Sequence, residues 1–155
     1  RSGDLDPIIP LYIMKTQNKT VDEVDNLLNK QSGMFGLCGY SDNRDVEAKY
    51  LAGDPDAITA MQVYTYSIVK YIGAYTAALG GADAIVFTGG VGENGSMVRK
   101  MICDRLAFMG IELDEEANNT RGKTIEISKP GSKVRVFVIP TNEELVIAQD
   151  TVKLI

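Results

Sequence analysis

The fold is decided by the stretch Asp83-Ala-Ile-Val-Phe-Thr-Gly-Gly-Val-Gly-Glu-Asn94. Its residues 84–87 form a short, continuous apolar run, which is typical of a central strand covered on both faces. The glycines of 88–94 then turn the chain, and the apolar pattern from Ser96 to Met109 predicts a helix. A strand, a glycine turn and a helix in this order form half of a parallel α/β unit, whose ligand site lies at the carboxyl end of the strand. We therefore expect residues 88–94 to border a binding crevice.

Downstream of this unit, the sequence predicts a strand pair and a final helix. Two alternating, β-branched runs, 123–128 and 133–139, are joined by Lys129-Pro-Gly-Ser132 and predict paired strands. A helix is expected over about 143–153, and the polar stretch 114–122 predicts a surface loop. The sequence thus indicates an α/β fold with a mixed sheet and packed helices.

Upstream of the strand, the sequence begins with two helical patterns. Asp6 is placed as the N-cap of the first helix, with Pro7 at its first position, and we expect this short helix to face the interior. Thr20 and Glu23 have the spacing of a capping box, which predicts a second helix that runs to about Lys30.

Further helices are expected between these and the strand. The stretch 31–40 carries three glycines and predicts a connecting loop with a short turn or helix, in which the backbone approaches a neighbour closely. A helix is predicted over Asp45–Ala52, and the longest one over 55–79. Apolar residues cover most of the circumference of this longest helix, so we expect burial on several sides.

The length and charge of the chain limit the classes of function. Its 155 residues fit one compact domain, and its net charge of -5, with 16 scattered Lys and Arg residues, argues against nucleic-acid binding. No run approaches the roughly 20 apolar residues of a membrane span, and no signal segment opens the chain, so a cytoplasmic location is expected. Cys38 and Cys103 are far apart and predict neither a redox pair nor a zinc site.

The chain has no histidine, which restricts its chemistry. Imidazole is the usual general base near neutral pH and a common metal ligand. Carboxylates, arginines, amides and a hard metal ion remain, and phosphoryl transfer can use that inventory. The sequence opens on Arg1-Ser-Gly-Asp4 without an initiator Met, which we interpret as a start within a longer protein.

Local patterns leave alternatives open at each candidate site. Residues 89–92 match neither a dinucleotide-binding GxGxxG nor a P-loop, so a tight strand-to-helix turn is one reading and a ligand contact the other. Taken alone, residues 41–45 favour a helix-capping turn with a solvated charge pair over a ligand contact. Glu143 and Glu144 lie at a predicted helix N-terminus, where acidic residues are favoured without any function.

Four stretches together resemble the acetate kinase (acetokinase) family. They are residues 83–94 continuing to Val98-Arg99, Arg1-Ser-Gly-Asp-Leu-Asp-Pro7, Ser41-Asp-Asn-Arg-Asp45 and Ile139-Pro-Thr-Asn-Glu-Glu144. The resemblance covers the whole chain and implies part of a ribonuclease H-like (actin-like ATPase) lobe. It also implies that residues 1–155 are a C-terminal, nucleotide-binding domain fragment of a two-lobed kinase that closes on its nucleotide.

The resemblance also implies a set of site residues. Glu143 would be the acidic residue associated with Mg²⁺, and Arg1 the catalytic arginine that holds the carboxylate substrate and neutralises the transferred phosphoryl group. Contacts with ATP or ADP are implied for two groups of residues: Gly89, Gly90, Val91, Gly92 and Asn94 on one side, and Asp42, Asn43 and Arg44 on the other.

The implied activity of the full-length protein is the interconversion of acetate and ATP with acetyl phosphate and ADP. A propionate kinase of the same family is the nearest alternative, and a non-catalytic nucleotide-binding or oligomerisation module is another. The family's catalytic histidine and aspartate and a second arginine have no counterpart in the sequence, so we expect the 155-residue chain to be inactive without the N-terminal lobe. A homodimer through the helix 55–79 is also expected.

Overall fold

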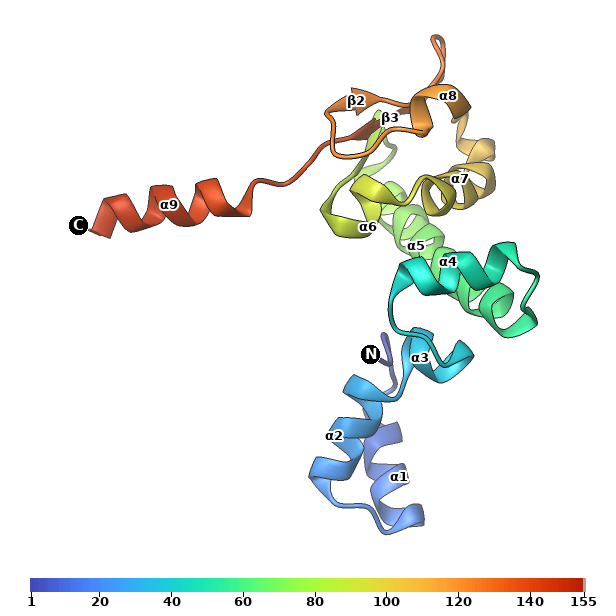
Figure 1. Ribbon diagram of the computed structural model, residues 1–155, viewed down its shortest axis with the longest axis vertical. Helices are drawn as coiled ribbons and strands as arrows, with labels where there is room; N and C mark the ends of the chain where they lie inside the picture. The colour runs from blue at the N-terminus through green and yellow to red at the C-terminus, as the bar shows by residue number, and fades with distance from the viewer. Residues whose placement is uncertain (155) are drawn as a thin grey trace. The chain divides into compact units, whose positions relative to one another are not determined.

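The computed structural model describes residues 1–154 (Figure 1). Its contacts divide the chain into two compact units, Arg1–Tyr64 and Thr65–Ile155. The length of the chain fits one compact domain, and the contacts within it fall into these two units. The division falls within one long helix.

The first unit begins with two helices, α1 (Ile8–Gln17) and α2 (Val21–Lys30). α1 begins at Ile8 with Pro7 as its N-cap residue, one residue later than predicted, and the Asp6 carboxylate accepts a hydrogen bond from the Ile8 N–H at 2.9 Å. The capping box of α2 is confirmed: Glu23 donates its N–H to Thr20 Oγ1 at 3.3 Å, and the Thr20 N–H reaches Glu23 Oε2 at 2.8 Å. The bond from the Thr20 N–H, and next the bond from the Thr20 hydroxyl at 3.0 Å, lower the pKa of Glu23.

The expectation that α1 faces the interior is wrong for this chain. Ile8, Leu11 and Tyr12 are 59%, 58% and 63% exposed. An apolar pattern indicates which face of a helix prefers burial, but a neighbouring element must supply the cover. The residues that the structure describes do not bury that face.

The stretch 31–40 contains the short helix α3 (Gly33–Cys38), and α4 spans Asn43–Leu51. The predicted close approach of the backbone is confirmed at Gly33, whose φ is +63°. A Cβ there would lie 2.2 Å from the carbonyl oxygen of Arg1. Helix α4 begins two residues earlier than predicted, because the Asp42 carboxylate accepts a hydrogen bond from the Arg44 N–H at 2.9 Å.

The longest helix, α5, spans Pro55–Leu79 as predicted. Burial on several sides is wrong for its second half. Its fully buried residues, Ala57, Ala60, Met61 and Thr65, lie in the first eleven positions. Farther along, the large side chains of Tyr66, Tyr71, Tyr75 and Leu79 are exposed. Within residues 1–154, none of the helices combines the length and the apolar character needed to cross a bilayer.

The second unit contains a mixed sheet, which confirms the predicted sheet type. Its strands are β1 (Ala84–Phe87), β2 (Ile125–Glu126) and β3 (Arg135–Val138), in the order β1-β3-β2. β1 runs parallel to β3, with Phe87 opposite Val138, and β2 runs antiparallel to β3. The carboxyl ends of β1 and β3 therefore lie at the same edge of the sheet.

β1 is not the central strand that its apolar run predicts. β3 lies in the middle, and its Val136 and Val138 are fully buried. Val86 of β1 is 50% exposed, and Phe87 alone of that strand is buried. A continuous apolar run indicates a strand that can be covered on both faces, but the cover depends on neighbours far away in the sequence.

Helices follow each parallel strand. The predicted glycine turn after β1 is instead a six-residue helix, α6 (Gly89–Asn94), and α7 (Ser96–Arg105) follows it. α7 ends earlier than the predicted Met109, where a 3-10 turn, η1 (Ala107–Met109), takes its place. The predicted loop 114–122 also contains a helix, α8 (Glu115–Asn118), started by the Asp114 side chain.

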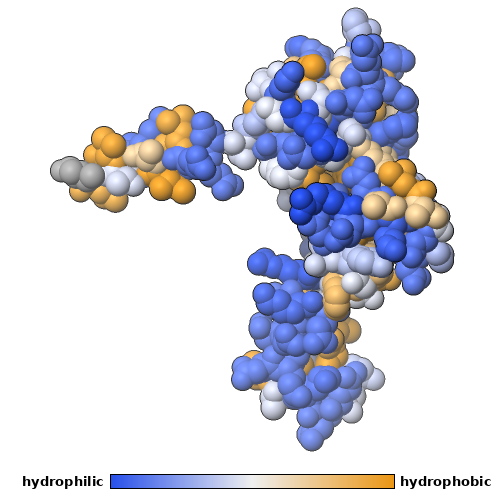
Figure 2. All heavy atoms as spheres, in the orientation of Figure 1, coloured by the Kyte–Doolittle hydropathy of each residue, from blue (hydrophilic) through white to orange (hydrophobic). Residues whose placement is uncertain are grey.

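The last helix, α9 (Glu143–Leu154), confirms the prediction for the C-terminal end. Every one of its residues is exposed. Figure 2 shows hydrophobic residues, in orange, on the surface of this helix. Ile147 and Val152 are 66% and 73% exposed.

Candidate functional site

The candidate site is built around α6, at the carboxyl end of β1. Thr88 is extended, and Gly89 starts the helix with φ at +70°, a conformation that favours glycine. A Cβ placed at Gly89 or Gly90 would meet nothing within 4 Å. The backbone of α6 is thus open on the side of these two glycines, and a flat ligand could approach it closely.

Gly92 and Gly95 are glycines because of packing within the chain. A Cβ at Gly92 would lie 3.2 Å from the carbonyl carbon of Phe87, and one at Gly95 would lie 2.7 Å from the carbonyl oxygen of Val91. Both glycines allow α6 to pack against the strand and the next helix. Gly92 therefore owes its identity to packing within the chain, whereas nothing in the described residues requires a glycine at Gly90.

Asn94 ends α6 and is exposed. Its Nδ2 donates a hydrogen bond to the carbonyl oxygen of Gly90 at 2.9 Å, which fixes the side chain beside the open glycine face. An amide carries two donor protons and an acceptor oxygen, so Asn94 keeps hydrogen-bonding capacity for a ligand. Val91, between these residues, is half-buried.

Glu93 was not singled out by the sequence, and it connects two of the four resembling stretches. Its Oε1 accepts hydrogen bonds from the N–H of Gly89 at 2.8 Å, the N–H of Thr141 at 2.9 Å and the Thr141 hydroxyl at 3.1 Å. The bond from the Thr141 N–H is the main cause that lowers the pKa of Glu93. Its partner lies 48 residues away, so no local pattern could have revealed the contact.

Arg99 is the second residue that sequence patterns left without a role. It is fully buried. Its Nη1 donates to the Gly92 carbonyl at 2.8 Å, its Nε to Asn118 Oδ1 at 2.8 Å, and its Nη2 to the carbonyls of Asn118 at 2.5 Å and Thr120 at 3.0 Å. Burial lowers the pKa of Arg99. Carbonyl and amide oxygens from three segments surround the charge, and α6 is thereby held to α8.

Glu143 and Glu144 lie in the first turn of α9, and both are exposed. The Asn142 side chain accepts a hydrogen bond from the Leu145 N–H at 3.0 Å and caps the helix. Within residues 1–154, no three His, Cys, Asp or Glu side chains cluster as a metal site. A hard cation at Glu143 would need its remaining oxygen ligands from phosphate groups and water.

The remaining predicted site residues lie in the first unit. Asp42 and Arg44 form a bidentate ion pair. The Arg44 Nε donates to Asp42 Oδ1 at 3.0 Å, and its Nη2 donates to Asp42 Oδ2 at 2.6 Å. The Arg44 side chain lowers the pKa of Asp42 to about 2, and that arginine side chain is 89% exposed. The capping turn and the solvated charge pair are therefore both present. Asn43 Oδ1 is buried without a hydrogen-bond partner among the described residues.

Arg1 lies at the start of the first unit with an exposed side chain. Its backbone is held in place: the Ser2 N–H donates to the Leu28 carbonyl at 2.8 Å, and Gly33 packs against the Arg1 carbonyl. The guanidinium is available to an anionic group.

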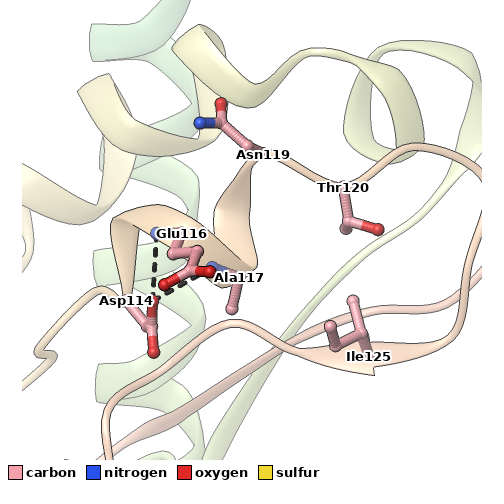
Figure 3. Close-up of a pocket in the computed structure, with 6 residues that line it drawn as sticks. All are labelled: Asp114, Glu116, Ala117, Asn119, Thr120 and Ile125. Atoms are coloured by element: carbon pink, nitrogen blue, oxygen red, sulfur yellow. Dashed lines mark hydrogen bonds between the residues drawn. The ribbon is translucent and has the colours of Figure 1, made fainter.

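A separate hollow of about 440 Å³ in the second unit contains none of the predicted site residues (Figure 3). It is lined by Asp114, Glu116, Ala117, Asn119, Thr120 and Ile125. The Asp114 carboxylate is already engaged, because its Oδ1 accepts the N–H groups of Glu116 and Ala117 at 3.0 Å each. We assign no ligand to this hollow.

Comparisons with known proteins place these features in context. The sequence model of the Acetokinase family matches residues 1–149. The acetate kinase of Halothermothrix orenii is 52% identical over 156 residues, and that of Coprothermobacter proteolyticus is 55% identical over 157. Each alignment covers 100% of this chain and 39% of the relative. The chain thus spans about two fifths of the length of these curated relatives.

Solved structures give the same picture. The crystal structure of Porphyromonas gingivalis acetate kinase matches with a TM-score of 0.89 and 46% identity, over 99% of this chain and 39% of that one. A propionate kinase from Francisella tularensis matches with a TM-score of 0.87 and 40% identity. The match covers 96% of this chain and 38% of that one. The predicted fold class, an α/β part of a ribonuclease H-like (actin-like ATPase) lobe, is confirmed.

Proposed function

Because this chain belongs to the acetokinase family, we propose that it is the C-terminal, nucleotide-binding part of an acetate kinase. The complete enzyme would transfer a phosphoryl group between ATP and acetate, giving acetyl phosphate and ADP, and would also run in reverse. The observation that carries the proposal is the open backbone at Gly89 and Gly90, with the exposed Asn94 beside it. Nothing else in the described chain accounts for a glycine at position 90.

The adenosine part of the nucleotide is assigned to α6. Gly90 and Val91 offer backbone and a half-buried apolar side chain to a flat ring, and the Asn94 amide can pair with ribose hydroxyls. Gly89 and Gly92 shape the turn that presents them. We also assign nucleotide contacts to the pair of Asp42 and Arg44 and to their neighbour Asn43. The exposed face of the Arg44 guanidinium can stack on a ring, and the buried Asn43 Oδ1 still lacks a donor.

Charge neutralisation at the phosphates is assigned to Arg1 and to a Mg²⁺ ion that Glu143 would hold. Mg²⁺, when bound, neutralises phosphate charge, and the exposed Glu143 would hold it through retained waters. The Arg1 guanidinium would hold the planar carboxylate of the substrate and face the transferred phosphoryl group, because its fork binds two oxygens at once.

The setting of the enzyme follows from the same proposal. We place it in the cytoplasm, where ATP is available, as a homodimer joined through α5. The exposed tyrosines of that helix, Tyr66, Tyr71 and Tyr75, support such an interface. Without the N-terminal part of the kinase, we expect residues 1–155 to be inactive, because half a cleft cannot exclude water or align the reacting groups.

A propionate kinase is the second candidate, and the similarity to the Francisella tularensis propionate kinase favours it. A test uses two chimaeras, in which residues 1–155 replace the matching part of the Halothermothrix orenii acetate kinase or of that propionate kinase. We expect both to form acyl phosphates from ATP, each with the substrate preference of its host. If both prefer propionate, the second candidate replaces the first. If both fold and neither forms an acyl phosphate, only a non-catalytic binding module remains.

A further inference from the structure

The carboxylate of Glu93 stands between the two parts of the proposed site. It lies on α6, whose backbone is assigned to adenosine, and it binds Thr141, which lies two residues before Glu143. One oxygen atom, Oε1, receives the donors of both segments, from Gly89 and from Thr141. A shift of either segment would therefore lengthen a hydrogen bond to the same atom.

The sheet brings the two segments to this point but does not hold them beyond it. Along the parallel pair β1 and β3, the last ladder bond runs from the Ile139 N–H to the Phe87 carbonyl at 3.0 Å. Beyond that bond, β1 is followed by α6, and β3 is followed by residues 140–142. Among residues 1–154, Glu93 makes every hydrogen bond that joins these two segments.

The first turn of α9 depends on this link. All residues of the helix are exposed, so its own side chains do not anchor it within the described chain. The Asn142 cap orders the turn internally. The bonds from Thr141 to Glu93 are what tie the turn with Glu143 to the turn with Gly90 and Asn94.

We propose that Glu93 is a positioning residue that couples nucleotide binding to metal binding. This inference rests on the proposed function. By fixing residues 140–142 against α6, the carboxylate keeps Glu143 where the phosphates of a nucleotide on α6 would meet it. Binding of either ligand then makes the site ready for the other, and the coupling is reciprocal.

The experiment uses the 155-residue chain and its Glu93→Ala and Glu93→Gln variants, with ADP and Mg²⁺ as probes. Glutamine keeps an acceptor oxygen at the same position, so it is the conservative variant. Glu112→Ala removes an exposed carboxylate elsewhere in the second unit and is the matched control. Two readouts are taken: amide hydrogen exchange at Gly89 and Thr141, and the ADP dissociation constant with and without Mg²⁺.

Alanine at 93 should speed exchange at both amides and reduce the strengthening of ADP binding by Mg²⁺ at least about fivefold. The Gln variant should restore most of both effects, and the control should change neither. Unchanged coupling in a folded Ala variant, while wild type binds ADP with Mg²⁺ dependence, would overturn this inference alone. No ADP binding by wild type would overturn the proposed function and the inference with it.

Discussion

The buried guanidinium of Arg99 on α7 donates a hydrogen bond to the carbonyl oxygen of Gly92 at 2.8 Å. This bond joins α7 to the backbone of α6, the helix that carries the candidate site. The same side chain also binds Asn118 and Thr120. Arg99 thus ties α6 to α8 and to residue 120.

Replacing Arg99 by lysine should destabilise the fold. One ammonium group cannot reach the four acceptors that the guanidinium now serves, and the unpaired ones stay buried. We expect a loss of about 2 to 4 kcal/mol in the free energy of unfolding, measured by urea denaturation. Arg105→Lys, at the exposed end of the same helix, is the control and should unfold like wild type. An unchanged midpoint for Arg99→Lys would contradict the role assigned to this residue.

Two glycines of α6 should respond differently to alanine. Gly92→Ala places a Cβ 3.2 Å from the Phe87 backbone and should lower the free energy of unfolding by about 1 kcal/mol or more. Gly90→Ala meets open space and should leave stability unchanged or slightly raised, because alanine favours a helix. Thermal unfolding followed by circular dichroism compares them, and equal losses would show that the open face is misplaced.

Asn94→Ala should weaken nucleotide binding without weakening the fold, because the exposed side chain has one internal hydrogen bond. In the acetate kinase chimaera we expect the KM for ATP to rise at least about tenfold, with the KM for acetate little changed. Asn29→Ala removes an amide from the exposed surface of α2 and serves as the control. An unaltered KM for ATP would remove Asn94 from the site.

Acid should weaken the β2–β3 pair through Glu126. The side-chain bond from Arg135, and next the bond from Ser128, lower the pKa of Glu126 from 4.5 to about 2. Because the folded pKa is the lower one, its stabilising effect is present above the unfolded value and is lost as pH falls from 4.5 towards 2. Glu126→Gln should therefore be less stable than wild type near neutral pH, and the two free energies of unfolding should converge as the pH approaches the folded pKa of about 2. A constant difference across this range would refute the assignment.

The two thiols should react at very different rates. Cys103 is buried, and burial raises its pKa to about 12, whereas Cys38 is half-buried at the end of α3. A disulfide reagent at mildly alkaline pH should label one thiol in the folded chain and the second after unfolding. Cys38→Ser should abolish the fast phase. Fast labelling that survives this change would place Cys103 at the surface.

Local chemistry predicts much of this structure. Residues close together in the sequence predict the capping box of Thr20 and Glu23. They also predict the bounds of α5 and β1. The contacts that build the site do not follow from such local patterns. Glu93 binds a partner 48 residues away, and Arg99 one that is 19 residues away. No periodicity encodes such pairs.

Exposure was the other property that sequence patterns misjudged. The apolar faces of α1 and of the second half of α5 predict burial, and both are exposed in the described chain. A pattern gives the preference of a face, while the covering element decides its burial. The nucleotide-contacting residues rested on the family resemblance, and their roles stay predictions.

The most direct test of the account is a titration of the isotope-labelled 155-residue chain with ADP and Mg²⁺, followed by the amide NMR signals of each residue. At roughly millimolar ADP, we expect the largest shifts at Gly89, Gly90 and Asn94, with smaller ones at Glu143, and their loss in Asn94→Ala. A folded chain whose α6 signals stay unchanged at saturating ADP, or shift only elsewhere, would contradict the claim that this chain carries the nucleotide-binding part of an acetate kinase.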